Sequence, residues 1–560
     1  MATVTTWAGA DPSPDVPLNK AGVKAKDEHR ALSYSMERVL EELENLRDSP
    51  DNQDSVHDLR VSIRRCRSIA SVMEEVDPVP AWAEMRRAAK KLFHGLGALR
   101  DAQVMKAWVR KLAPEGDPIA AQLWADSAER EPRLRNDALR AARKFDGKNW
   151  RRLERALHRR TRLVPVGGLA AECLTLERFA AAKELHLRAM RTEQSRPWHA
   201  LRKSMKEFRY TVENLLPEHH TRWRGDLKRV QDLLGDIHDF DVLAAAIESV
   251  ELPEGEGDLA DAEAARGGIA QTPAASLEAS RRAWQEMLAR ERSDRIAAYR
   301  QLVLGNAGLW SAWRHALPHG PRQQDAAVAR LRATARAADA HPRRTARTAR
   351  LARALFRALR GAKGGVNSRV NREVKAGPVF ADANARQLLA TAASLHNVRA
   401  ESSRKSAHAG SPQKSAYKFL RGLTPPPGFA NADWAILLLT VRYYRGAEPR
   451  EKNSAFAKLS AEQQSTVRAL AGVLRLAHAL RKSGIENARL FRAENTAEAV
   501  ILRIPGLPDS VEAATRLAAA KHLLEIYLAK PLVLRSISEP TKMPVPAPTD
   551  APHHFAAASD

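Results

Sequence analysis

The sequence predicts an all-α protein in which two related helical bundles are followed by a further helical domain with a small α+β C-terminal cap. Segments rich in Ala, Leu, Arg and Glu, with apolar residues three and four positions apart, cover most of the chain, and this spacing is typical of amphipathic helices. The alternating β-branched pattern of strands is nearly absent before residue 487. A basic motif also occurs twice in the first half with the same internal spacing, which indicates two related bundles.

Helices are expected throughout the first half, with breaks where Pro and Gly occur. Their expected ranges are 22–47, 54–75, 80–94, 101–112, 117–144, 148–162, 170–193, 197–215, 221–234 and 239–249, followed by a helical pair within 274–316. We expect Gly97 and Gly235 to end helices, because glycine readily adopts the backbone conformation in which a helix stops. Residues 252–273 combine Pro, Gly and acidic residues, so we expect a flexible loop there.

A second helical set begins near Gln323 and extends to about residue 486. Between residues 488 and 504 the apolar period shortens toward two, and a helical segment at 510–529 and an apolar run at 532–537 follow. This order predicts a small α+β cap over 487–537. Residues 1–21 and the Pro- and Ala-rich tail 538–560 are expected to be disordered.

Composition limits the functional classes. The 560 residues include 91 Lys and Arg against 66 Asp and Glu, a net charge of +25, which favours a polyanionic partner. With only two cysteines, Cys66 and Cys173, a disulfide framework and a cysteine-based zinc site are excluded, and a reducing, cytoplasmic location is expected. Apolar runs such as 435–441 are far shorter than the roughly 20 residues that span a bilayer, so we expect no membrane association.

The repeated motif carries the chemistry. Four basic residues at offsets 0, 3, 7 and 10 fall within an arc of about 80° on a helix. The two copies are His57, Arg60, Arg64 and Arg67, and His199, Arg202, Lys206 and Arg209. Apolar residues at matching offsets lie beside each basic stripe: Leu59, Ile63 and Cys66, and Leu201, Met205 and Phe208. The cations therefore adjoin the buried faces of the helices, which predicts a shared anion site rather than two solvated surfaces.

A second pair of segments extends the repeat. Lys90-Lys91 and Leu96-Gly-Ala-Leu-Arg-Asp101 match Lys228-Arg229 and Leu234-Gly-Asp-Ile-His-Asp239, so Arg100 corresponds to His238. If a helix begins after each glycine, Asp101 and Asp239 lie near its N-terminus, where a carboxylate is favourable. Alternatively, these carboxylates orient a neighbouring arginine.

These motifs, in this order, resemble the conserved-histidine α-helical domain (CHAD) family over residues 22–316. The resemblance implies two antiparallel helical bundles, at about 22–145 and 146–316, related by a pseudo-twofold axis. It also implies a basic cavity between them that binds inorganic polyphosphate, and an association with polyphosphate granules. The residues it assigns to that cavity are His57, Arg60, Arg64, Arg67, Lys90, Arg100, His199, Arg202, Lys206, Arg209, Lys228 and His238.

Between about residues 344 and 483, the second half contains Leu395-His396-Asn397, Lys414-Ser-Ala-Tyr417, Val441-Arg-Tyr-Tyr-Arg445 and Leu474-Arg-Leu-Ala-His-Ala-Leu480 in this order. This segment resembles the C-terminal helical domain of exopolyphosphatase and guanosine pentaphosphate phosphohydrolase proteins, which is related to HD-type phosphohydrolases, and the cap at 487–537 also fits. We assign residues 323–486 to this helical domain. An active HD site needs carboxylate and imidazole ligands around a divalent metal. The corresponding positions here are Arg344, His396, Asn397 and His478. Because the carboxylates are missing, we expect a degenerate domain without catalysis, bound metal or cofactor. Its basic residues, Arg399, Arg404, Lys405, Lys414, Arg442 and Arg445, either extend an anion-binding track or simply form a solvated surface.

The leading hypothesis is thus a protein that binds polyphosphate and is not an enzyme. The alternative is a metal-dependent phosphohydrolase that acts on polyphosphate or a guanosine polyphosphate through the second half. A nucleic-acid-binding protein is less favoured, because aromatic residues make up 5% of the chain and Tyr210 is the sole aromatic candidate beside the stripes. The oligomeric state is left open.

Overall fold

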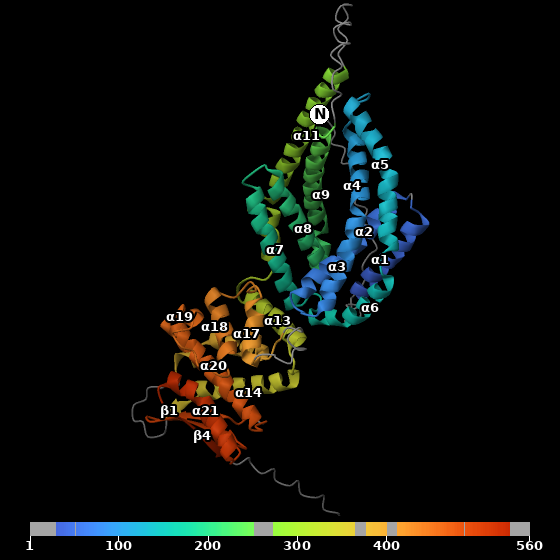
Figure 1. Cartoon of the computed structure of the whole chain (residues 1–560). Helices are drawn as coiled ribbons and strands as arrows, with labels where there is room; N and C mark the ends of the chain where they lie inside the picture. The colour runs from blue at the N-terminus through green and yellow to red at the C-terminus, as the bar shows by residue number, and fades with distance from the viewer. Residues whose placement is uncertain are drawn as a thin grey trace, which may run out of the picture. The chain divides into compact units, whose positions relative to one another are not determined.

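The computed structural model describes residues 30–50, 52–250, 273–364, 377–399, 411–486 and 488–537. Three predicted features lie outside the described residues. They are the N-terminal segment at 1–29, the loop at 252–273 except for residue 273, and the tail at 538–560. The chain divides into two compact units (Figure 1). The first comprises residues 1–340 with 398–409 and 421–431, and the second comprises 341–397, 410–420 and 432–560.

The first unit contains two successive sets of helices (Figure 1). The first set is α1 (Arg30–Asp48), α2 (Gln53–Glu74), α3 (Pro80–Gly95), α4 (Gly97–Leu112), α5 (Pro118–Arg143) and α6 (Gly147–Leu157), which continues into the 3-10 helix η1 (His158–Leu163). The second set is α7 (Leu169–Ala189), α8 (Ser195–Leu215), α9 (Pro217–Glu248), α11 (Pro273–Val303) and α12 (Leu309–Ala316). A further helix, α13 (Gly320–Ala338), packs on α7.

Helices pack in the same order in both sets, as the repeated motif predicts. In the first set, α1 packs against α2, α2 against α3, and α4 against α5. In the second, α7 packs against α8, α8 against α9, and α9 against α11. Helix α9 therefore occupies the place that α3 and α4 share in the first set. The two sets meet where α2 packs against α8, the two helices that carry the basic stripes.

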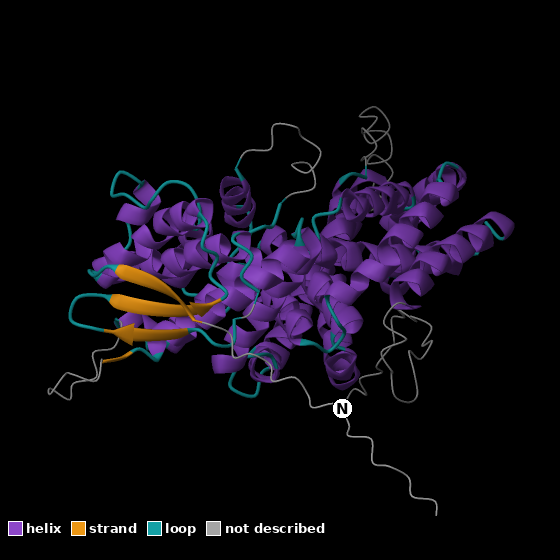
Figure 2. Ribbon diagram, turned by 90° about the horizontal axis from the view of Figure 1, so that it is seen from below, coloured by secondary structure: helices purple, strands orange, loops and turns teal. Residues whose placement is uncertain are grey.

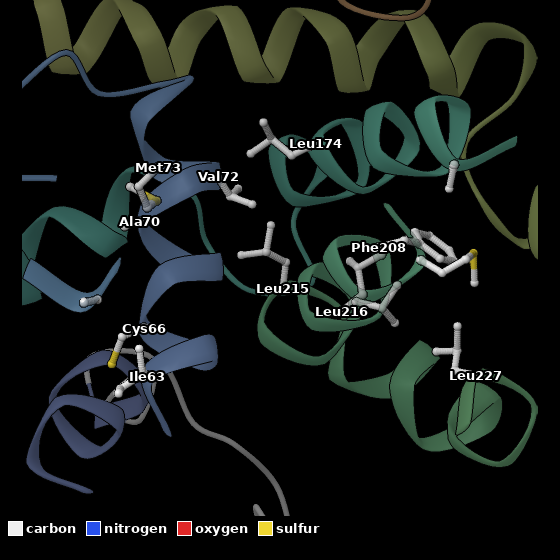
Figure 3. Packing of buried hydrophobic residues seen from close by; sticks show 14 of the residues in the cluster. Ile63, Cys66, Ala70, Val72, Met73, Leu174, Phe208, Leu215, Leu216 and Leu227 are labelled. Atoms are coloured by element: carbon white, nitrogen blue, oxygen red, sulfur yellow. The ribbon is translucent and has the colours of Figure 1, made fainter. Parts of the chain in front are cut away.

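The apolar stripes of α2 and α8 form part of one core. Leu59, Ile63 and Cys66 are completely buried, as are Leu201, Met205 and Phe208. All six belong to a continuous cluster of buried residues, and Figure 3 shows Ile63, Cys66 and Phe208 within it. Burying a side chain of this size contributes about 1.5–3 kcal/mol, so the core fixes the rotation of both helices. That rotation in turn fixes where the adjoining cations point.

One predicted break is wrong. The chain does change helix at Leu96–Gly97, but Gly235 lies in the interior of a single helix, α9, which replaces the two expected helices at 221–234 and 239–249. Glycine costs about 1 kcal/mol in a helix interior, and the burial of Leu234 and Ile237 beside it outweighs that cost. Asp239 consequently lies in the middle of a helix rather than near an N-terminus.

The second unit is also mainly helical and ends in a small sheet. Its helices are α14 (Pro342–Arg360), α15 (Ala383–Leu395), α17 (Pro412–Arg421), α18 (Asn431–Tyr443), α19 (Ser454–Ala457), α20 (Ala461–Lys482) and α21 (Val511–Leu528), with the 3-10 helix η2 (Pro378–Phe380). Its strands are β1 (Lys363–Gly364), β2 (Arg492–Asn495), β3 (Val500–Pro505) and β4 (Leu532–Ile537).

These strands form one sheet in the order β1-β2-β3-β4 (Figure 2). Strand β2 runs antiparallel to β3, whereas β1 is parallel to β2 and β4 is parallel to β3. The parallel pair β3 and β4 is joined through α21, as a parallel connection requires. The predicted fold class, all-α with a small α+β cap, is therefore confirmed, although β1 was not expected. None of the helices in the described ranges is both long and apolar enough to cross a membrane.

Candidate anion-binding site

A cavity of about 1000 Å³ lies in the first unit, and α2, α3, α4, α8 and α9 supply most of its lining. Ten of the twelve residues predicted for the anion site line it: His57, Arg60, Arg64, Arg67, Lys90, Arg100, His199, Arg202, Lys206 and His238. The other two, Arg209 and Lys228, are not among the lining residues. The two basic stripes, 142 positions apart in the sequence, thus face one common space.

The lining of this cavity is strongly cationic. It contains ten Arg and Lys side chains and four His side chains, against five Asp and Glu side chains. Burial lowers the pKa of Arg60 to about 10, and the neighbouring Arg64, Arg100 and Arg202 act in the same direction while Asp101 opposes them. Burial also lowers the pKa of Arg67 and of Arg202. Guanidinium groups stay charged near neutral pH despite such shifts, so the cavity holds like charges at close range.

In the first helical set, an aromatic ring supports the guanidinium groups. The Cζ atom of Arg60 lies 4.0 Å from the centre of the Phe93 ring, and that of Arg67 lies 5.1 Å from it. Arg60 Nη1 also donates a hydrogen bond of 3.3 Å to the carbonyl oxygen of Phe93. Stacking of this kind holds the planar groups in place and leaves their edges available to an anion.

The second set differs at the equivalent position. Three residues before the matched Leu-Gly pair, Phe93 is replaced by Gln231. The Oε1 atom of Gln231 accepts a hydrogen bond from Arg209 Nη1, whereas the corresponding Arg67 stacks on Phe93. Gln231 lines the cavity in place of Arg209. The repeat therefore conserves the position of the cation but not its exposure to the cavity.

Asp239 orients Arg202. This is the second of the two roles that the sequence suggested for this carboxylate. Its Oδ1 atom lies 3.9 Å from Arg202 Nη2, and its Oδ2 atom accepts a hydrogen bond of 3.4 Å from Trp108 Nε1. Burial raises the pKa of this carboxyl group, while Arg202 opposes the rise. The carboxylate thus holds Arg202 at the cavity wall and ties α9 to α4.

The two histidines of the second set contact each other. His199 on α8 and His238 on α9 have their Nδ1 atoms 3.1 Å apart and their ring centres 4.5 Å apart. Burial lowers the pKa of His238 to about 4, with Arg202, His199 and Lys206 adding to the effect. Burial also lowers the pKa of His199, and Arg202, Lys203 and Lys206 add to this effect. Both imidazoles are therefore neutral in this state near pH 7.

Several lining residues were not predicted from the sequence. Phe93 and Trp108 line the cavity, and so does Tyr210, the aromatic residue singled out beside the stripes. Lys203 follows His199 by four positions, a spacing that could have revealed it. Arg178 on α7 lies outside both repeated motifs, and no sequence signal marks it.

In the second unit, the predicted degenerate HD positions come together only in part. His396 is completely buried, and its ring centre lies 6.5 Å from that of His478. Burial lowers the pKa of His478 to about 3, and the nearby Arg481 adds to the shift. Asn397 Nδ2 donates to Thr345 Oγ1 at 2.9 Å, and Arg344 is exposed on α14. Within the described residues, no three His, Cys, Asp or Glu side chains are grouped so that they could hold a metal ion.

Comparison with known protein families gives two matches, one in each half of the chain. Residues 30–248 match the family model of the CHAD domain. The helices that supply most of the cavity lining, α2, α3, α4, α8 and α9, lie within this matched region. Residues 365–525 match the model of Ppx/GppA phosphatase, domain III, so both sequence resemblances are confirmed.

Comparison with individual proteins adds little to the family matches. The crystal structure of the CHAD domain from the plant Ricinus communis is 20% identical, with a TM-score of 0.36 over 49% of this chain and 90% of that one. A comparison with curated proteins gives no match.

Proposed function

We propose that the CHAD domain binds inorganic polyphosphate in the cavity between α2 and α8. The observation that carries this proposal is the convergence of two equivalent basic stripes on one space of about 1000 Å³. Polyphosphate is a flexible chain in which every unit carries negative charge and no unit carries a base. Closely spaced Arg and Lys donors are the groups that bind such a ligand, because they form charge-assisted hydrogen bonds with phosphate oxygens.

The aromatic lining favours polyphosphate over a nucleic acid. Single-stranded nucleic acids bind through aromatic faces on which bases stack. Here the ring of Phe93 is covered by Arg60 and Arg67, and Lys111 Nζ lies 4.6 Å from the centre of the Trp108 ring. The rings support cations instead of offering their faces to bases.

We also propose that the protein is a binder and not an enzyme. Hydrolysis of a phosphoanhydride in an HD-type site requires a metal-activated water. An amide at Asn397 and an exposed guanidinium at Arg344 supply neither the charge nor the basicity that such a site needs. Polyphosphate accumulates in granules, so we propose a cytoplasmic location at these granules.

The test compares two double variants of the full chain that lose the same charge. Arg60→Gln with Arg202→Gln removes one half-buried, cavity-lining cation from each stripe, whereas Arg343→Gln with Arg350→Gln removes two exposed cations from α14. A hydrogen bond to a charged group contributes about 1.5–3 kcal/mol. We therefore expect the first variant to bind long-chain polyphosphate at least tenfold more weakly, and the second to bind nearly as the unchanged protein does.

Titration of labelled polyphosphate at about 0.15 M salt gives these affinities, and circular dichroism checks that both variants are folded. Equal losses in the two variants would mean that the net positive field, and not the cavity, binds the ligand. Single-stranded RNA is the competitor in the same assay. Displacement of bound polyphosphate by RNA at similar phosphate concentration would favour the nucleic-acid alternative.

A further inference from the structure

The His199–His238 pair makes the charge of the cavity variable. In the first helical set, the position equivalent to His238 is held by Arg100, a residue with a permanent charge. In the second set, the same position carries an imidazole whose Nδ1 atom lies 3.1 Å from that of His199. Both histidines line the cavity. One half of the site is thus permanently charged at this position and the other half can titrate.

The geometry of the pair fixes how many protons it accepts. A hydrogen bond between two Nδ1 atoms needs one proton between them, so in the neutral pair one ring carries its hydrogen on Nδ1 and the other on Nε2. A single added proton can attach to the remaining bare Nε2 atom without disturbing this hydrogen bond. Both Nε2 atoms then carry hydrogen and can donate to an anion. A second added proton would place two N–H groups against each other and break the contact.

The surroundings oppose protonation while the cavity lacks an anion. Arg202, Lys203 and Lys206 on α8 are the cations nearest to His199, and Arg100 on α4 lines the same space. Three carboxylates on α9 already have cationic partners. The Nε atom of Arg292 on α11 lies 2.8 Å from Asp241 Oδ1, and the Nε atom of Arg295 on α11 lies 2.9 Å from Asp236 Oδ2. Asp239 is paired with Arg202. The remaining carboxylates in the lining are Asp101 on α4, Glu207 on α8 and Asp232 on α9, and the cations still outnumber the acidic groups.

We propose that the His199–His238 pair takes up one proton when polyphosphate enters the cavity, so that binding tightens as the pH falls. This inference rests on the proposed function. The phosphate charges cancel the excess of positive charge that keeps the pair neutral, so the pKa of the pair is higher in the complex than in the ligand-free protein. Linkage then requires that binding takes up protons over the pH range between these two values.

The test measures polyphosphate affinity of the full chain from pH 7.5 to pH 5.5. A long-chain ligand is used because its internal phosphate groups stay singly ionised over this range. Uptake of one proton changes affinity by up to tenfold per pH unit, and we expect binding about tenfold tighter at pH 5.5 than at pH 7.5. Calorimetry in buffers with different heats of ionisation should show the uptake of about half a proton on average over this range, rising toward one proton near pH 5.5.

Two variants assign the effect to the pair. His238→Arg installs the residue of the first set and should bind more tightly at pH 7.5 with little pH dependence. His238→Gln should bind polyphosphate at pH 5.5 and at pH 7.5 about as weakly as the unchanged protein does at pH 7.5. His315 on α12 does not line the cavity, so His315→Gln is the matched control and should keep the pH dependence of the unchanged protein.

The outcomes separate this inference from the proposed function. Polyphosphate binding that does not change with pH, or a His238→Gln variant that keeps the full pH dependence, would overturn the role of the pair and leave the proposed function standing. If the protein binds no polyphosphate at any pH, the proposed function itself fails.

Discussion

At the scale of single residues, Phe93 shows how a site for anions uses an apolar side chain. Arg60 and Arg67 both place their guanidinium groups against its ring, and Arg60 also donates to its carbonyl oxygen. A long arginine side chain loses rotamer freedom when it binds a ligand. The ring holds two of them in place beforehand, so part of that entropy is already lost before the ligand arrives.

Replacement of Phe93 by Leu tests this support. Each of the two stacked cations contributes about 0.5–1 kcal/mol at a partly exposed site, so Phe93→Leu should weaken polyphosphate binding by about five- to thirtyfold. The matched control is Phe145→Leu, which truncates a partly buried ring that packs on Trp150 in the same unit and should leave affinity unchanged. Both are measured by polyphosphate titration at constant salt. Unchanged affinity in Phe93→Leu would show that the ring has no part in holding the arginines.

The sequence revealed the stripe residues of the site but not their partners. His57, Arg60 and Arg64 could be found because the offsets of a repeat survive in the sequence. Phe93 lies on a different helix, and its contact with Arg60 depends on how α3 packs against α2. Arg209 has the spacing of the stripe, but its guanidinium donates a hydrogen bond to Gln231. Spacing along one helix predicts a direction, whereas partners across helices depend on tertiary packing.

At the scale of elements, α13 lies in the first unit, although sequence spacing assigned it from Gln323 onward to the next domain. Arg330 on α13 is 3% exposed. Its Nε atom lies 3.2 Å from Glu177 Oε1 on α7, and its Nη2 atom lies 4.0 Å from Oε2 of Glu75. Glu75 also binds Arg178, which lines the cavity. Helix α13 therefore helps to hold one wall of the site.

Removal of this buried charge should destabilise the first unit. Burial raises the pKa of Glu177 and Arg330 opposes that rise, so Arg330→Met leaves the carboxylates with less compensation. The loss of one partner of a buried ion pair typically costs about 3–5 kcal/mol. Arg332→Met, at an exposed position of the same helix, is the control and should stay within about 0.5 kcal/mol. Urea unfolding of both variants measures the difference, and identical midpoints would contradict the role given to Arg330.

Element boundaries were predicted best where local sequence signals agree with packing. Helix α2 begins after Asn52, whose side chain accepts a hydrogen bond from the backbone of Asp54, and α3 begins at Pro80, as its sequence indicates. Gly235 gives the opposite local signal, and the packing of α9 overrides it. Strand β1 has two residues and is defined only by its pairing with β2, so no local sequence pattern could predict it.

At the scale of the whole molecule, the second unit contains the segment that matches Ppx/GppA phosphatase, domain III, and the proposal that the protein is not an enzyme is tested there. We expect the full chain, mixed with polyphosphate and Mg²⁺, Mn²⁺ or Zn²⁺, to release no phosphate above the rate without protein. Ion chromatography or a colorimetric phosphate assay measures this release. Sustained turnover that His396→Ala abolishes would contradict the proposal that the protein is not an enzyme and would place the chemistry at the buried histidines.

The imbalance of ten cations against five carboxylates in one cavity has a thermodynamic consequence. A cavity with this charge attracts small anions from any buffer, and a long chain displaces many of them in a single event. The gain is largely the entropy of the displaced ions. If the cavity binds polyphosphate as proposed, its occupancy in a cell depends on how much chloride, free phosphate and nucleotide surrounds the protein, and the site fills less readily where these competitors are concentrated.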